Sequence, residues 1–491
     1  MNAGHRRLLL AILAVAAVLR LAALDAQSLW LDELASWQQA SAPSLRDVIA
    51  RLRSDVHPPL FAILLHFAIG AFGDSESALR LPSALAGIAA VYAIFRVGEQ
   101  LWSVREGLLA AALLAVSWTP VQYAQEARSY SLLMLATLAA FGCALAALRR
   151  LERGERIPGT AIAGFWLAAT AACYLHYFGL LFVALIAVGL GLRAAARPRG
   201  LAGAALLLVP VAVAFLPWIG LAYQDATGPP GWIPPTPPDA PLEYLEFLFK
   251  RPGEMKRVVA LLLLAFALVS WRRRGERPAP SGKEGAGAAG SRRGSPELPA
   301  TALVCAWLVV PFAAALAISF ALVPVFTNKN LIVSLPAAYL LLSRATLRLP
   351  RRPQLAAALA LTLVGMSAFG VLANGRYWRR PHREQFREAT SALLARSWDP
   401  AAGRILAYPA FGFDYYLAKQ QAPRPVDFAL VPRPHLAAAT AFLTSDRSQT
   451  RWLLTAHHDA EPELLLALER DYALVLEERF YYAWLRRYER R

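Results

Sequence analysis

An acidic pair, Asp32 and Glu33, stands between two tryptophans, Trp30 and Trp37. Two neighbouring carboxylates in a half-apolar setting disfavour each other's charge, and this raises one pKa toward the working range of a general base. Asp is also a preferred N-cap residue, so Asp32 equally suits the start of a helix near Leu34. A cap can also be a base, and we expect this pair to supply the group that takes a proton.

Two cations occur in short polar stretches between long apolar runs, Arg128 and Lys329. Both suit an anionic phosphate better than a neutral solute, because each keeps its charge and donates several hydrogen bonds. Arg128 closely follows Glu126, and an ion pair between these two residues is the alternative. We expect a phosphate contact at Arg128 and include Glu126 and Lys329 in the candidate site.

Two histidines accompany these charges. His57 follows Asp55 by two residues and precedes two prolines, which fix the backbone and so aim the His57 side chain. His176 precedes Tyr177 in another short polar stretch. Asp55 and His57 are potential ligands of a divalent metal, but no third ligand stands at a metal-type spacing, so metal binding stays open. A hydrogen-bonded structural histidine is the alternative at both positions.

The chain as a whole has the composition of a membrane protein. Of its 491 residues, 57% are hydrophobic and only 17% are charged, which excludes a disordered chain and most soluble enzymes. The net charge of +17 would suit nucleic acid, but the arginines cluster in short runs between apolar stretches, as expected where positive charge orients membrane spans. We therefore expect no nucleic-acid partner.

The apolar runs predict an all-α polytopic fold with about eleven transmembrane helices. These are expected near 8–24, 79–101, 107–124, 131–148, 160–174, 178–192, 201–222, 257–271, 300–322, 331–346 and 354–372. Residues 58–73 are apolar too, but counting them as a span would reverse the sides of the arginine clusters. We expect them to form a short helix at the outer interface, and the first run to be an uncleaved anchor rather than a signal peptide.

With the arginine-rich turns inside, every candidate residue falls in an outer turn. Ionisable groups packed against membrane spans are costly and tend to mark function, although contact with headgroups and water is the simpler alternative at any one position. The convergence of several such groups on one face favours a common site.

The amino-acid composition of the chain changes at two places. The Gly-, Ala- and Arg-rich stretch 272–298 predicts a flexible cytoplasmic linker within a transmembrane domain of residues 1–373. Residues 374–491 predict a small α/β domain on the outer face, which is either a stabilising or an acceptor-binding appendage. Its strand-like and helix-like runs are 404–408, 411–419, 452–455 and 462–470, followed by an extended aromatic end at 472–488.

Five segments of the chain resemble the GT-C glycosyltransferases of the protein O-mannosyltransferase and lipid A aminoarabinose transferase type, grouped as glycosyltransferase family 39. These segments are 30–33, 55–60, 78–84, 125–130 and 174–179. The resemblance implies a sugar donor carried on polyprenyl phosphate, an acceptor that enters from the outer side, and an acidic base in the first outer loop. By this resemblance Asp32 takes the acceptor proton, Glu33 supports it or orients the acceptor, and Arg128 holds the lipid phosphate.

The chemistry of the residues agrees with this reading. Displacement of phosphate at an anomeric carbon needs one base and cations for the departing oxygens, and it inverts the anomeric configuration. The expected co-substrate is a lipid-linked sugar, with a divalent metal as an open possibility and a glycan, lipid or protein as acceptor. The expected donor and substrate contacts are Arg128, His57, Glu126, Asp55, His176, Tyr177 and Lys329.

High Ala and Arg usage and lipid-carrier chemistry suggest, by analogy, a bacterial inner membrane with the active site on the periplasmic face. The alternative function is a transporter or flippase of a lipid-linked saccharide. Transporters usually show polar positions near mid-membrane and internal repeats, whereas the polar groups of this chain gather at one face. The sequence therefore favours the enzyme.

Overall fold

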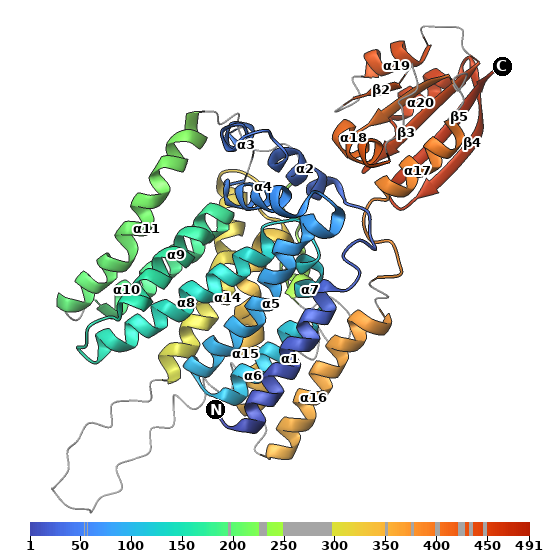
Figure 1. The fold of residues 1–491 in the computed structure, drawn as a ribbon. Helices are drawn as coiled ribbons and strands as arrows, with labels where there is room; N and C mark the ends of the chain where they lie inside the picture. Colours follow the sequence, from blue (N-terminus) through green and yellow to red (C-terminus); the bar gives the residue numbers. More distant parts are fainter. Residues whose placement is uncertain are drawn as a thin grey trace, which may run out of the picture. The chain divides into compact units, whose positions relative to one another are not determined.

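The computed structural model describes residues 1–53, 55, 57–194, 198–224, 233–248, 297–348, 352–374, 378–397, 403–420, 428–431, 436–444 and 449–491. Most of these residues are helical, and a five-stranded sheet follows near the C-terminus (Figure 1). The contacts divide the chain into two units. The membrane unit comprises Met1–Ala22, Ile49–Phe61 and Leu81–Gly375, and the C-terminal unit comprises Ala23–Val48, Ala62–Arg80 and Arg376–Arg491.

The helices before residue 375 follow the apolar runs of the sequence. In chain order they are α1 (Ala3–Leu21), α2 (Leu31–Ala40), α3 (Leu45–Leu52), α4 (Leu60–Phe72), α5 (Glu76–Leu101), α6 (Val104–Val116), α7 (Trp118–Ala124), α8 (Tyr130–Glu152), α9 (Gly159–Leu175), α10 (Phe178–Ala194), α11 (Pro198–Gln224), α12 (Ala240–Leu248), α14 (Glu297–Ala321), η1 (Asn328–Ser334), α15 (Leu335–Arg348), α16 (Pro353–Phe369) and η2 (Gly370–Asn374).

Six helices of the described residues are long and apolar enough to cross a membrane, or up to seven if the bent pair α6 and α7 forms one span. A described helix lies at every predicted span except 257–271, which falls outside the described residues. The 13 residues of α4 give a length of about 20 Å, well short of the roughly 30 Å of hydrocarbon in a bilayer. This length agrees with the prediction of a short helix at 58–73.

The break between α6 and α7 is a 62° bend at Ser117. A bend of this size leaves carbonyl groups at the end of α6 without helical partners. Arg20, fully buried in α1, donates from Nη2 to the carbonyl of Leu114 and from Nη1 to that of Ala115, both at 2.9 Å. A charge inside a predicted span thus has a structural role that the hydropathy pattern did not reveal.

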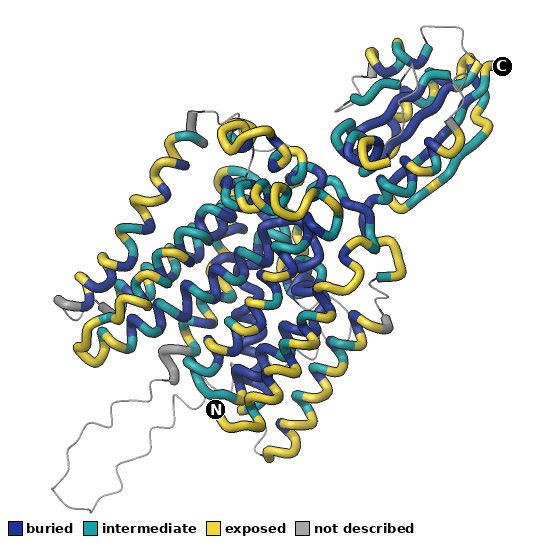
Figure 2. The backbone as a smooth tube through the Cα atoms, in the orientation of Figure 1, coloured by how far each residue is buried: buried dark blue, intermediate teal, exposed yellow. Residues whose placement is uncertain are grey.

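The interior of the membrane unit is formed by α8 and α15. Most residues of the apolar stretch Asn328–Arg348 are buried, whereas most residues of α11 and α16 are not (Figure 2). The exposed residues of α11 and α16 include apolar ones such as Leu206 and Leu361. Helices α5 and α6 pack closely at two glycines, because a Cβ on Gly98 would lie 2.7 Å from the Cα of Gly107.

The predicted α/β domain is present, with the sheet order β2-β1-β3-β5-β4. Strand β1 runs parallel to β2 and β3, while β5 is antiparallel to β3 and β4. The elements are α17 (Phe386–Ser397), β1 (Arg404–Tyr408), α18 (Ala410–Lys419), β2 (Phe428–Leu430), α19 (Leu436–Thr444), β3 (Thr450–Ala456), α20 (Pro462–Glu469), β4 (Tyr472–Phe480) and β5 (Ala483–Arg490).

Strands β1 and β3 are buried along almost their whole length, as expected of central parallel strands (Figure 2). The aromatic end predicted as one extended run is a hairpin, which turns at Tyr481 and Tyr482. The predicted linker 272–298 lies outside the described residues up to 296, and its last two residues begin α14.

Candidate active site

Asp55, His57 and Arg128 form a hydrogen-bonded chain in the membrane unit. Asp55 Oδ1 lies 2.8 Å from both the backbone nitrogen and Nδ1 of His57, and Arg128 Nη2 lies 3.0 Å from His57 Nε2. Because a guanidinium only donates, Nε2 accepts and the ring hydrogen sits on Nδ1, from where it is donated to Asp55. His57 is therefore neutral in this arrangement and fixes the orientation of Arg128.

The backbone around these residues is held by local features. Pro58 and Pro59 are buried immediately before α4 and fix the approach of the chain to that helix. Arg128 lies in the turn between α7 and α8, with 7% of its surface exposed, and its carbonyl accepts a hydrogen bond of 2.8 Å from the Ser83 hydroxyl of α5. The guanidinium of Arg128 also lies 5.7 Å from the ring centre of Tyr130.

His176 lies beside this chain, in the tight turn between α9 and α10. Its ring centre is 5.8 Å from that of His57, its Nδ1 accepts from the backbone of Phe178, and its side chain hydrogen-bonds with Asn330. Burial, together with the charges of Arg128 and Lys329, lowers the pKa of His176 to about 3. His176 is therefore neutral at physiological pH.

Asp55 and Arg128 are the charged members of the hydrogen-bonded chain. Burial raises the pKa of Asp55, but its hydrogen bonds with His57 and the charge of Arg128 outweigh this effect, so the pKa lies below its usual value. With His57 and His176 neutral, Arg128 and Lys329 are the two cations whose charges act on His176. Such cations suit an anion.

Tyr177 and Glu126 occupy the same turns as His176 and Arg128. The Tyr177 hydroxyl accepts from Trp218 Nε1 at 3.2 Å, and burial together with the charge of Asp55 raises its pKa. Glu126 is buried and accepts a hydrogen bond of 3.1 Å from Gln122. The polar residues around Asp55, Arg128, His176 and Lys329 come from segments far apart in the sequence, and all of them belong to the membrane unit.

The acidic pair, Asp32 and Glu33, belongs instead to the C-terminal unit. Helix α2 begins at Leu31 with Trp30 as its N-cap, so the suggestion that Asp32 caps a helix near Leu34 is wrong. Asp32 lies in the first turn and is half-buried, and its carbonyl accepts from the Ser36 hydroxyl at 3.0 Å.

Glu33 is fully buried and pairs with an arginine that the sequence analysis did not select. Arg80, only 1% exposed, donates from Nε to Glu33 Oε1 at 2.7 Å and from Nη2 to Oε2 at 2.6 Å. Arg383 adds a third contact of 3.3 Å to Oε2. The carboxylate of Glu33 is thus bound by two guanidinium groups.

Arg80 also holds the backbone that precedes α2. It donates to the carbonyls of Leu24, Gln27 and Ser28 at 2.5, 2.8 and 3.1 Å. Arg80 lies within the segment 78–84 that carried the family resemblance, and a charge within an apolar span was the signal that could have identified it.

Among the described residues, no three His, Cys, Asp or Glu side chains lie together as a metal site would require. Asp55 and His57 are paired with each other, and Arg128 occupies the second nitrogen of the histidine. The described residues therefore do not fit a divalent metal at this position.

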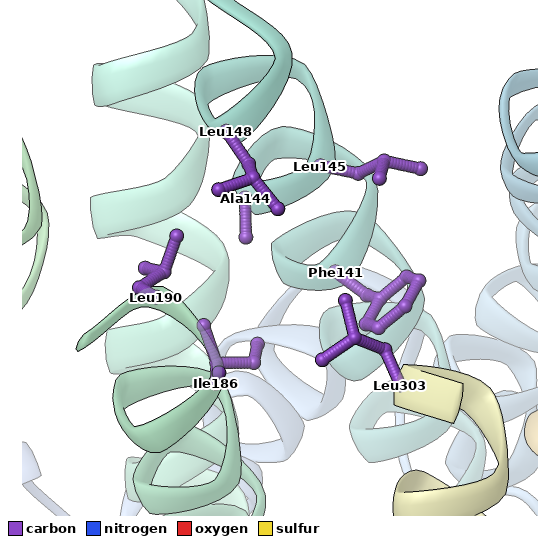
Figure 3. A pocket seen from close by; sticks show the side chains of 8 residues that line it. Phe141, Ala144, Leu145, Leu148, Ile186, Leu190 and Leu303 are labelled. Atoms are coloured by element: carbon purple, nitrogen blue, oxygen red, sulfur yellow. The ribbon is translucent and has the colours of Figure 1, made fainter. Parts of the chain in front are cut away.

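The membrane unit also contains a small apolar pocket (Figure 3). Helices α8, α10 and α14 line it with Phe141, Ala144, Leu145, Leu148, Ile186, Gly189, Leu190 and Leu303. None of these side chains can hydrogen-bond a sugar or a phosphate. The pocket is also nearer the Glu152 end of α8, whereas Arg128 precedes its Tyr130 end, so the pocket is separate from the polar cluster.

Residues 56–218 match a family model described as dolichyl-phosphate-mannose-protein mannosyltransferase. This range contains His57, Arg128 and His176. No curated protein matches the chain by sequence.

Solved structures share the fold over nearly the whole chain. ArnT from Cupriavidus metallidurans bound to undecaprenyl phosphate is 15% identical, with a TM-score of 0.56 over 97% of both chains, and its apo state gives 14%, 0.55 and the same coverage. The oligosaccharyltransferase of Archaeoglobus fulgidus, tethered to an acceptor peptide, is 11% identical, with a TM-score of 0.52 over 93% of this chain and 69% of that one.

The helical membrane fold with a C-terminal sheet domain is thus like that of ArnT. Residues 56–218 thus match the dolichyl-phosphate-mannose-protein mannosyltransferase family, and the chain is a multi-pass membrane protein with a fold like that of ArnT.

Proposed function

We propose that the protein transfers one sugar from a polyprenyl-phosphate carrier to an acceptor hydroxyl, with inversion, on the periplasmic face of a bacterial inner membrane. The observation that supports this proposal best is the buried guanidinium of Arg128 in the membrane unit, which neutral His57 orients. A fixed guanidinium suits the phosphate of a lipid-linked sugar.

In the proposed reaction the bond between the anomeric carbon and the phosphate oxygen breaks. The acceptor oxygen bonds to the anomeric carbon from the opposite face, and the acceptor proton passes to Asp32. The leaving group is polyprenyl phosphate, and Arg128, supported by Lys329, stabilises the charge that develops on its oxygens. Asp55 and His57 keep Arg128 oriented, and His176 and Tyr177 line the same group of turns.

Asp32 is proposed as the base because it is half-buried on a helix whose start is firmly held, whereas the carboxylate of its neighbour Glu33 is bound by two arginines. Glu33 is thereby proposed to position the base indirectly, through Arg80, and not to contact the acceptor.

Native mass spectrometry of the detergent-purified protein tests the donor site. We expect wild-type protein supplied with a polyprenyl-phosphate sugar to retain it, and Arg128→Ala to lose it. Arg105→Ala is the matched control, because Arg105 is an exposed arginine in the first turn of α6. Wild-type protein that retains only bulk phospholipid would contradict the donor assignment.

A transfer assay tests the base and identifies the acceptor class. Membranes that contain the protein are incubated with a labelled polyprenyl-phosphate sugar, and the label is then measured in lipid, glycan and protein fractions. We expect Asp32→Asn to bind the donor as wild type does but to transfer no label. Equal transfer by the variant and wild type would rule out Asp32 as the base.

A further inference from the structure

The segment that carries the proposed base is bound by the C-terminal domain of the same unit. We call residues 24–33 the base loop, because they lead from the end of α1 to Asp32 and Glu33. Residues 24–30 have no helix or strand of their own. We propose that α17 and α18 hold the base loop in place, so that the C-terminal domain positions the catalytic carboxylate; this inference rests on the proposed role of Asp32.

Arg387 of α17 makes the first group of contacts. Its guanidinium donates to the carbonyls of Asp25 and Ala26 at 2.9 and 3.3 Å, and to the Glu76 carboxylate at 2.6 Å. Its backbone nitrogen donates to the hydroxyl of Ser28 at 3.1 Å. One residue of the domain thus fixes three positions of the base loop.

Tyr416 of α18 makes the second group. Its hydroxyl accepts a hydrogen bond of 2.6 Å from the backbone nitrogen of Leu29 and donates one of 2.6 Å to Glu76. Tyr416 is only 3% exposed, so water cannot readily replace the hydroxyl if it is removed. Leu29 lies three residues before Asp32, and its placement fixes where α2 begins.

Arg383 makes the third contact, with the buried carboxylate of Glu33 at 3.3 Å. The domain therefore binds the base loop at its start, at its middle and beside the proposed base. A loop that is held at several points keeps its side chains in one geometry. A misplacement of about 1 Å at a reacting group can cost about 100-fold in rate. The structure thus gives the domain a part in the chemical step as well as in stability.

The test compares two adjacent tyrosines of α18. Tyr416→Phe removes the hydroxyl that holds Leu29, whereas Tyr415→Phe removes one that donates to the carbonyl of Asp74, outside the base loop. Both variants keep the aromatic ring. Hydrogen exchange of the peptides that cover the base loop is measured in the full-length protein, together with kcat and the KM for a polyprenyl-phosphate sugar.

We expect Tyr416→Phe to speed exchange in the base loop and to lower kcat about tenfold or more, with the donor KM within about twofold of wild type. Tyr415→Phe should leave both readouts near wild type. Unchanged exchange in the base loop, or an equal loss of kcat in both variants, would overturn the proposal.

Arg387→Lys provides a second variant if Tyr416→Phe does not fold. It keeps a cation near Glu76 but lacks the planar group that reaches two carbonyls, and it should also loosen the base loop and lower kcat. Wild-type exchange and kcat in this variant would again oppose the proposal. Failure of the proposed function would appear differently, as full transfer by Asp32→Asn regardless of the exchange result.

Discussion

Asp32 and Glu33 are adjacent acids, but their substitutions should affect different properties. Substitution of Glu33 should lower stability, whereas substitution of Asp32 should abolish transfer. Glu33→Gln keeps the side-chain volume but leaves the guanidinium of Arg80 buried against a neutral amide. Glu33 and Arg80 are 0% and 1% exposed and are joined by contacts of 2.7 and 2.6 Å. Removing one partner of such a buried pair costs about 3–5 kcal/mol, and because glutamine retains one acceptor we expect the lower end, about 3 kcal/mol.

Thermal unfolding in detergent, followed by tryptophan fluorescence, measures this loss, and the 13 tryptophans of the chain supply the signal. A loss of about 3 kcal/mol corresponds to a fall in apparent Tm of about 6–12 °C for a folding unit of this size. Asp32→Asn, at a half-buried position, should shift Tm by less than about 2 °C while it abolishes transfer.

The reasoning fails if Glu33→Gln unfolds at the wild-type temperature and nevertheless loses transfer. That result would give Glu33 a direct chemical role and would make the ion pair with Arg80 unimportant for the fold. A large fall in Tm for Asp32→Asn would likewise show that Asp32 has a structural role.

Three further predictions follow from burial and charge. Burial lowers the pKa of His176 from 6.5 to about 3, so below pH 6.5 the unfolded chain binds a proton that the folded chain excludes. The free energy of unfolding should therefore fall by about 1.4 kcal/mol per pH unit below 6.5. His176→Asn should flatten the decline of Tm between pH 6.5 and 5, and an unchanged slope would contradict this. Gly98→Ala should cost about 1–3 kcal/mol, because its Cβ would lie 2.7 Å from Gly107, whereas Gly365→Ala, with no atom within 4 Å, should not lower Tm. Lys329→Gln should weaken donor binding about two- to fivefold and reduce its salt dependence, as measured by titration at two ionic strengths, and equal affinity in both proteins would remove Lys329 from the site.

Much of this protein could be predicted from its sequence because the relevant signals are local. Long apolar runs predict membrane helices wherever they occur, since a helix satisfies its backbone hydrogen bonds within the segment. The pair formed by Asp55 and His57 is local as well, because the two residues lie two positions apart and the following prolines fix the backbone. The strands β1 and β3 were predictable from their own composition.

The tertiary structure decided what each charge contacts. Glu33 and Arg80 are 47 residues apart in the chain, and Glu33 and Arg383 are 350 apart. Arg128, 71 residues from His57 in the chain, donates to Nε2 of His57 and so determines that the ring hydrogen sits on Nδ1. No local pattern encodes such partners, because electrostatic pairing depends on which segments the fold brings within a few ångströms. The sequence by itself therefore determined the spans, the polar turns and the candidate residues, and only the fold separated a buried structural acid from its half-exposed neighbour.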